Sequence, residues 1–275
     1  MRALIFIIIL FISGFACSGQ NNNYSQLESR KNNNGNWLLY KRGDTKPFTG
    51  TAEKLYSNGK ISNEDEYING KFDGKSILYF STGKLSRITY YTDGKYNGET
   101  IIYHDNGKIQ SKKSYKNGIQ EGAEITYFPS GKICSYVFYK EGATTDTATY
   151  WYENGKKNIM YVYKNGKMQN YFRWDTIGNI LNECYYNDYN SFVKDISWYT
   201  NGEKKSESIL INGLMDSTFT VWYETGAIKE IIHYSNGEWN GLWTDYDIKG
   251  NITSQGEYKN DQLIKGDQMY MIVEL

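Results

Sequence analysis

Few residues in this sequence have the types and spacing that catalysis or metal binding requires. His104 and His233 are the only histidines, they lie far apart, and neither pairs with a nucleophile on sequence grounds. Glu64, Asp65 and Glu66 form an acidic run whose charges we expect to face solvent or a neighbouring strand. A metal site needs clustered His, Cys or carboxylate ligands at defined spacing, and the sequence shows no such cluster. We therefore predict no catalytic residue, no metal and no cofactor, and so no enzyme.

Aromatic residues recur at a fixed spacing, and this recurrence reflects an internal repeat. An aromatic residue followed by a turn glycine occurs nine times, and successive glycines are 24 residues apart except for one step of 23 between Gly155 and Gly178. These marker glycines are Gly59, Gly83, Gly107, Gly131, Gly155, Gly178, Gly202, Gly226 and Gly250. A fixed period of this length indicates a repeat array whose units are each too small to bury a core alone.

Each unit carries a second turn eleven residues after its marker glycine, as in the Asp-Gly pair at Gly94 and the Asn-Gly pair at Gly118. Such pairs between β-rich runs are strong hairpin signals, because type I′ turns need positive φ at both central residues. The runs between turns are rich in Tyr, Trp, Ile, Val and Thr and have the length of ordinary strands. We predict an all-β protein: an elongated antiparallel single-sheet array of about nine 24-residue β-hairpin repeats at 48–266, with a capping strand at 267–275.

Stacked hairpins would align three rows of side chains. The first row, four residues before each marker glycine, is aromatic in eight of nine repeats, the second, two residues after it, is mostly Ile, and the third, eight residues after it, is mostly Tyr. If both turns contain two residues, the first row lies on one face and the other two rows lie on the opposite face; another turn length would change this phase. Our candidate binding ladder is taken from the first row: Tyr103, Tyr127, Trp151, Trp174, Trp198, Trp222 and Tyr246.

Two interpretations of this ladder stay open. It is either a stacking platform for sugar rings, peptide or another flat ligand, or a structural row whose rings shield one another and the backbone of a single-layer sheet. Exposed aromatic surface of that extent would mark an interaction site, since large apolar patches rarely go unused. Nucleic-acid binding by stacking needs a basic groove as well. The chain has 31 basic and 31 acidic residues, so we expect no nucleic-acid partner.

The N-terminus has the parts of a secretory signal. Arg2 is its only charge, residues 3–12 form a continuous apolar run, and small residues precede Cys17. Such a run is too short to span a bilayer as a mature helix. We predict a signal peptide at 1–16, and the polar residues at 17–47 as a structureless tether and lead-in.

The fate of Cys17 has two alternatives. The surrounding residues resemble a bacterial lipobox, in which the cysteine becomes the lipid-modified first residue, although Gly14 and Phe15 depart from its usual pattern. Lipidation at Cys17 would anchor the protein to a membrane of the bacterial cell envelope, as an outer-membrane or periplasm-facing lipoprotein. Ordinary cleavage would instead produce a secreted protein. Cys134 and Cys184 should lie about 20 Å apart at about 4.8 Å per strand, so we predict no disulfide between them.

The repeats resemble the MORN-variant repeat, known in bacteria as the YwqK-family antitoxin type. The resemblance rests on an aromatic-x-x-N-G-K segment followed by Y-x-N-G-K-x-x-G, seen most fully at 103–122 and 79–98. It covers roughly four-fifths of the chain. The middle repeats depart from it, because Asp146, Asn170, Val193 and Ser217 replace the closing glycine seen in other repeats.

The resemblance implies an extended hairpin array with a protein-interaction or scaffolding role. We therefore expect a non-enzymatic, envelope-associated protein that presents an extended β-surface to an unknown protein partner or a glycan. The alternative, implied by the family label, is an antitoxin or immunity protein that neutralises a partner toxin. Export counts against neutralising a toxin in the cytosol, but not against protection at the envelope.

Overall fold

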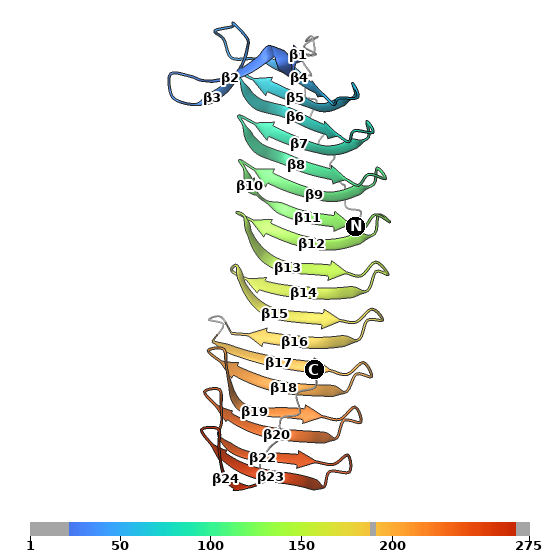
Figure 1. The fold of residues 1–275 in the computed structure, drawn as a ribbon, viewed down its shortest axis with the longest axis vertical. Helices are drawn as coiled ribbons and strands as arrows, with labels where there is room; N and C mark the ends of the chain where they lie inside the picture. The colour runs from blue at the N-terminus through green and yellow to red at the C-terminus, as the bar shows by residue number, and fades with distance from the viewer. Residues whose placement is uncertain (1–21, 188–190, 268–275) are drawn as a thin grey trace, which may run out of the picture.

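A computed structural model describes residues 22–187 and 191–267, which form a long, curved stack of β-hairpins (Figure 1). The predicted signal peptide at 1–16, Cys17, and residues 268–275 of the predicted capping strand lie outside the described residues. The strands are β1 (Asn22–Asn23), β2 (Leu27–Lys31), β3 (Trp37–Lys41), β4 (Gly50–Leu55), β5 (Ile61–Ile68), β6 (Lys71–Tyr79), β7 (Leu85–Thr92), β8 (Lys95–Tyr103), β9 (Ile109–Lys116), β10 (Ile119–Gln120), β11 (Gly122–Tyr127), β12 (Ile133–Lys140), β13 (Ala143–Trp151), β14 (Lys157–Lys164), β15 (Lys167–Trp174), β16 (Ile180–Tyr186), β17 (Phe192–Trp198), β18 (Lys204–Ile211), β19 (Leu214–Trp222), β20 (Ile228–Ser235), β21 (Glu238–Trp239), β22 (Gly241–Tyr246), β23 (Ile252–Lys259) and β24 (Gln262–Gly266), and a short 3-10 helix, η1, spans Tyr24–Gln26.

The predicted all-β fold with one elongated sheet is confirmed. Within residues 22–187 and 191–267, twenty-two strands belong to one sheet. From β4 to β24 the pairing is antiparallel and follows chain order, and β1 joins the edge of β4 in parallel. Strands β2 and β3 form a separate hairpin at the N-terminal end of the stack (Figure 1). Because neighbours in sequence are neighbours in space, each repeat contacts little beyond the repeats on either side.

The second turns that carry a glycine are the predicted two-residue type I′ turns. Thr92 pairs with Lys95 across Asp93 and Gly94, whose φ angles are 48° and 79°. Asn117 and Gly118 adopt the same conformation, with φ of 51° and 85°. Asn, Asp and Gly tolerate this left-handed region better than other residues, so these pairs set the hairpin register.

The marker turn is longer than two residues, and this corrects one prediction. Tyr79 pairs with Leu85, which leaves five residues in the loop, and the Phe80 amide donates to the Lys84 carbonyl over 2.8 Å. Gly83 completes the turn with φ of 90°. Direct partners lie on the same face of a sheet. The Ile row therefore shares a face with the Tyr/Trp row, and the prediction of opposite faces for these two rows is wrong.

The two faces of the sheet differ in how deeply they bury their side chains. We call the face that carries Trp174, Trp198 and Trp222 the Trp face. The opposite face, which we call the Ser/Thr face, has a central row of small residues in register across β5 to β8: Asp65, Ser76, Thr89 and Thr100. All four are buried. At the N-terminal end, Tyr24 of the cap reaches Asp65. Larger side chains beside this row on the same strands close over it.

Part of that cover is an aromatic stack built from the predicted Tyr row. Tyr67, Phe72, Tyr91, Tyr96 and Tyr115 follow one another along the Ser/Thr face with ring centroids 4.5, 4.9, 4.9 and 5.2 Å apart. These separations fall in the range where aromatic pairs attract each other, so the stack links the first three repeats.

The predicted structureless tether is a folded cap from residue 22 onward. Leu27 and Leu39 of the β2–β3 hairpin pack with Phe48, Ala52 and Tyr67 into one buried cluster. The polar average of the segment conceals these apolar side chains, which alternate with polar ones as a strand requires. The cap covers the N-terminal end of the sheet, as terminal units of repeat arrays do.

Candidate interaction surface

All seven residues of the predicted ladder lie on the Trp face, where each is the last residue of the strand that enters a marker turn. They are half-buried. They repeat every second strand, which is about 9.6 Å, so their rings are too far apart to stack on one another. The structure therefore forms the row that we predicted but not a continuous ring-on-ring platform.

Lysines occupy the spaces between the tryptophans. The ammonium of Lys204 lies 6.0 Å from the ring centroid of Trp198 and 5.0 Å from that of Trp222. Lys157 lies 5.4 Å from the ring of Trp174. These two lysines replace isoleucine in the Ile row. Their position over the indole rings explains the replacement, because the negative face of an indole ring attracts a cation.

An ion-pair network continues from this column across the Trp face. Glu207 accepts from Lys204 over 2.7 Å and from Lys194 over 2.8 Å. Burial by itself raises the pKa of Glu207, but the hydrogen bonds from Lys194 and Lys204 outweigh it and hold the pKa below its usual value. The carboxylate is therefore charged at neutral pH, and the Trp face combines two indole rings, two ammonium groups and one carboxylate within three adjacent strands, β17 to β19.

Sequence reasoning missed an apolar cluster beside this network. Phe192 pairs with Ile211, and Ile211 pairs with Leu214 across the second turn. All three lie on the Trp face and are 38, 41 and 49% exposed. The signal was present in the sequence, because this is the one second turn flanked by apolar residues on both sides.

The residues of the marker turns act inside the array. In the turn at Gly59, the Tyr56 hydroxyl donates to the Tyr79 carbonyl over 2.6 Å, Asn58 donates to the Ser81 carbonyl over 2.9 Å, and Lys60 donates to the Thr82 carbonyl over 2.6 Å. Each acceptor belongs to the next marker turn. Equivalent bonds recur from Tyr152, Asn154, Tyr199, Asn201 and Tyr223. The repeated aromatic-x-Asn-Gly-Lys segment therefore binds one repeat to the next.

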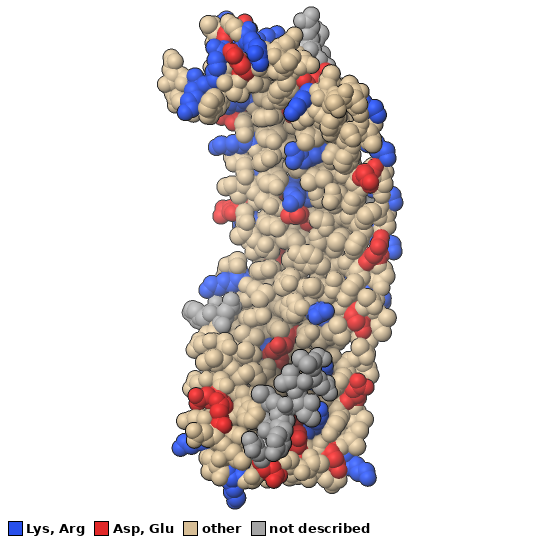
Figure 2. Space-filling model, in the orientation of Figure 1, with Lys and Arg blue, Asp and Glu red and all other residues tan. Residues whose placement is uncertain are grey.

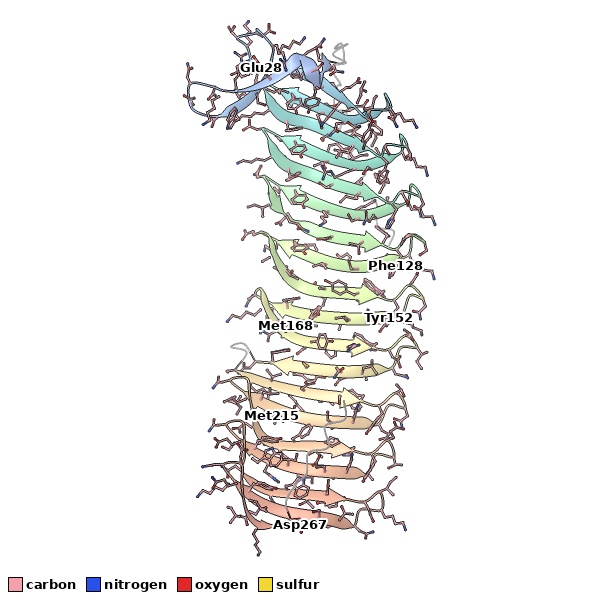
Figure 3. All side chains as sticks on the ribbon, viewed as in Figure 1. Glu28, Phe128, Tyr152, Met168, Met215 and Asp267 are labelled. Carbon is pink, nitrogen blue, oxygen red and sulfur yellow. The ribbon has the colours of Figure 1, made fainter. Side chains whose placement is uncertain are left out.

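His104 takes the place of the tyrosine in one of these turns. Its Nε2 atom lies 3.0 Å from the Tyr127 carbonyl, the same acceptor position that tyrosines use elsewhere. His233 contacts the Leu242 carbonyl through Nδ1. Both imidazoles are thus engaged with backbone groups. Figure 3 shows the two edges of the array, with Phe128 and Tyr152 at the marker turns and Met168 and Met215 at the second turns.

No group of three or more potential metal ligands occurs among residues 22–187 and 191–267. Over the same residues, no helix is long and apolar enough to cross a membrane. Cys134 and Cys184 are free thiols. Burial, followed by the neighbouring Asp195, raises the pKa of the Cys184 thiol to about 12, which keeps it protonated and unreactive.

Comparison with protein families supports a MORN-repeat protein. Three segments, at 96–117, 120–141 and 215–236, match the family described as MORN repeat variant. Each segment contains one marker turn and the strands on both sides of it. A search of curated protein sequences finds no match.

Solved structures with local similarity include a porin-like protein from Bacteroides uniformis, with 12% identity over 77% of this chain and 91% of that chain, at a TM-score of 0.20. The Tc holotoxin pore of Photorhabdus luminescens matches at 10% identity over 85% of this chain and 18% of that chain, with a TM-score of 0.18. A TcdB2–TccC3 structure matches at 12% identity over 85% of this chain and 14% of that chain, with a TM-score of 0.15. The chain spans less than a fifth of the last two proteins, and TM-scores at this level establish no common fold.

Proposed function

We propose that the protein is a non-enzymatic binding or scaffolding module of the bacterial cell envelope, and that it binds a protein partner through the Trp face of its C-terminal half. The observation that carries this proposal is the surface formed by Trp198, Trp222, the Lys194–Glu207–Lys204 network and the adjacent apolar cluster. Protein interfaces favour aromatic anchors beside apolar side chains, with charged groups that fix orientation.

A protein partner fits this surface better than a glycan does. Sugar rings bind by lying flat on an open aromatic face, whereas Lys204 already lies over Trp198 and Trp222. A sugar would have to displace the ammonium and its ion pair with Glu207. A protein side chain can instead pack against the exposed Phe192, Ile211 and Leu214 and leave the lysine in place.

The cellular location of the module depends on how its N-terminus is processed. A lipid on Cys17, followed by the cap at 22–47, would hold the array at a membrane surface, and ordinary cleavage would release the same array as a secreted protein. Intact-mass measurement of the chain from native cells, beside a Cys17→Ala variant, tests the anchor. An acylated N-terminus that the variant lacks supports lipidation, and an unmodified N-terminus contradicts it.

Site-specific photo-crosslinking in native cells tests the binding surface. A photo-reactive amino acid at Ile228, an exposed position on the Trp face directly opposite Trp222, should capture one discrete partner. Arg173 is the control position, because it is exposed and lies on the Ser/Thr face. Charge reversal by Glu207→Lys should abolish capture from position 228, because it replaces the ion pairs with Lys194 and Lys204 by repulsion between like charges.

Equal capture from both positions, or capture that survives Glu207→Lys, would contradict a partner site on the Trp face. The identity of a captured protein also decides between scaffolding and the antitoxin alternative. A captured protein that is toxic to cells lacking this chain and harmless in its presence would make the module an immunity protein.

A further inference from the structure

The second turns of the array are bonded to the unit before them, with one exception. The Gly118 amide, for example, donates to the Tyr96 carbonyl of the preceding repeat over 2.7 Å. Equivalent bonds of 2.7–3.0 Å are donated by the backbone amides of Gly70, Gly94, Gly142, Asn212 and Gly237. Within residues 22–187 and 191–267, the turn at Asn165–Gly166 is the only glycine-containing second turn that lacks such a bond.

The side chains of the preceding repeat also lie away from this turn. A Cβ atom placed on Gly118 would lie 3.9 Å from Lys95 of the preceding repeat, whereas one placed on Gly166 would have no described atom within 4 Å. Gly213 is equally open, but the amide of Asn212 keeps its turn bonded to the preceding repeat. The turn between β14 and β15 can therefore open locally without breaking a bond to its neighbour.

An Asn-Gly pair that can open undergoes a reaction of its own. The glycine nitrogen attacks the asparagine Cγ atom, because glycine has no side chain to hinder the approach. The new N–C bond closes a five-membered imide, the Cγ–Nδ2 bond breaks, and the departing nitrogen takes up the proton of the glycine amide and leaves as ammonia. Water then adds to one of the two imide carbonyls and opens the ring to an aspartyl or an isoaspartyl residue.

We infer that Asn165 is a site of spontaneous deamidation in the folded protein, and that it reacts ahead of the other Asn-Gly pairs. Asn165 has a φ of 53°, and closing the imide ring requires its backbone to rotate out of the type I′ conformation, so the turn must open first. Lys164 and Lys167 flank the turn, and Figure 2 shows cationic side chains on this edge of the array. The product adds a negative charge between these lysines, and its isoaspartyl form adds one atom to the main chain of a two-residue turn.

The Asn-Gly pairs of the marker turns have both reacting groups held in place. The Asn58 side chain accepts from the Lys60 amide over 3.1 Å and donates to the Ser81 carbonyl over 2.9 Å, and the Gly59 amide donates within the turn over 3.0 Å. The exposed side chain of Asn165 has no hydrogen bond among the described residues. Bonds like those of Asn58 hold Asn106, Asn154 and Asn201, and single hydrogen bonds engage Gly35, Asn97 and Asn240 of the remaining pairs.

Peptide mapping by mass spectrometry of the mature chain, incubated in warm and mildly alkaline buffer, tests this inference. Asn117 is the matched control, because both asparagines follow a lysine and precede a glycine. We expect Asn165 to gain the one-dalton mass of deamidation about two- to tenfold faster than Asn117, which is the effect of one neutral backbone hydrogen bond. In concentrated urea the two rates should converge, since the local sequences are alike and the bond from Gly118 is lost.

The products test the route of the reaction. Hydrolysis of the imide should give both isoaspartyl and aspartyl peptides, which chromatography separates, and each should carry one oxygen from isotopically labelled water. Equal rates at Asn165 and Asn117 in the folded chain would overturn the inference, and so would a faster reaction at a marker-turn asparagine such as Asn58. An aspartyl product alone would also overturn it, because the side-chain amide would then be hydrolysed directly and the glycine nitrogen would take no part.

Discussion

Replacing Tyr24 by Phe should loosen the N-terminal cap and leave the rest of the array unchanged. The Tyr24 hydroxyl donates to Asp65 Oδ2 over 2.8 Å and lies 2.6 Å from the Tyr67 hydroxyl. Asp65 is 3% exposed and also accepts a hydrogen bond from Ser76. The phenylalanine keeps the ring and removes only the hydroxyl, so the change isolates the polar contact between the cap and the first repeat.

The expected loss follows from the charge of the acceptor. A hydrogen bond to a charged group contributes about 1.5–3 kcal/mol, compared with about 0.5–1.5 kcal/mol for a neutral pair. Tyr56→Phe is the matched control, because its hydroxyl donates to the neutral Tyr79 carbonyl over 2.6 Å. Tyr24→Phe should therefore reduce the free energy of unfolding of the N-terminal repeats by about twice as much as the control does.

Hydrogen exchange measured by mass spectrometry is the suitable assay, because an array can open at one end while the remainder stays folded. Peptides within 50–80 should lose protection in Tyr24→Phe, and peptides within 200–240 should not. Unchanged protection at 50–80 would refute the role of this contact. An even loss along the whole chain would refute the nearest-neighbour description of the fold.

The contacts among Tyr24, Tyr67 and Asp65 also predict that the N-terminal end of the array is less stable at high pH. Burial raises the pKa of Tyr67 from the ordinary value of 10 to about 12. Burial is also the largest cause of the raised pKa of Tyr24, followed by its hydrogen bonds to Tyr67 and Asp65. A raised folded-state pKa contributes stability that is complete below pH 10 and is lost as the pH rises toward 12. Tyr24→Phe should reduce this alkaline dependence.

Three further predictions concern the array itself. Deleting one whole unit, 108–131, should leave a folded, shorter protein by circular dichroism, because stability is roughly additive along the array; global unfolding would contradict this. Ser217→Gly should stabilise the chain by about 1 kcal/mol in urea titrations, since Ser217 holds a φ of 68° that glycine adopts without strain; no gain would mean that the strain is absent. Burial raises the pKa of Glu230 and of its direct partner Asp245. The stability of the C-terminal repeats should therefore increase as the pH falls and these two carboxyl groups take up protons. Glu230→Gln should remove most of this pH dependence, and a stability that does not change with pH in the unaltered protein would contradict the pairing.

Much of the fold follows from local sequence. The Asn-Gly and Asp-Gly pairs predict type I′ turns because few other residues adopt positive φ at both positions, as Asn117 and Gly118 do. The period of 24 predicts an array because each hairpin needs its neighbours to bury side chains. The residues of the first row were also predictable, since strand ends before equivalent turns must align.

Which rows of side chains share a face of the sheet could not be predicted in the same way. It depends on the five-residue marker turn, which places the Ile row on the Trp face, and on a bulge that follows it: Tyr79 pairs with Leu85 but Leu78 pairs with Arg87, so the Tyr row returns to the opposite face. Sequence reasoning could not place Lys204 over Trp198 and Trp222, because that contact joins residues of three strands. The apolar cluster of Phe192, Ile211 and Leu214 also depends on register across two strand pairs.

Local sequence by itself determined the repeat, the turn types and the all-β class, because each depends on the conformational preferences of a few adjacent residues. Tertiary structure decided which rows share a face, which end of the sheet is covered, and what the recurring Tyr, Asn and Lys residues do. Tyr56 and Lys60 donate to carbonyl groups of the following repeat, more than twenty residues away. Such contacts exist only when two hairpins are stacked, so no single repeat contains the information.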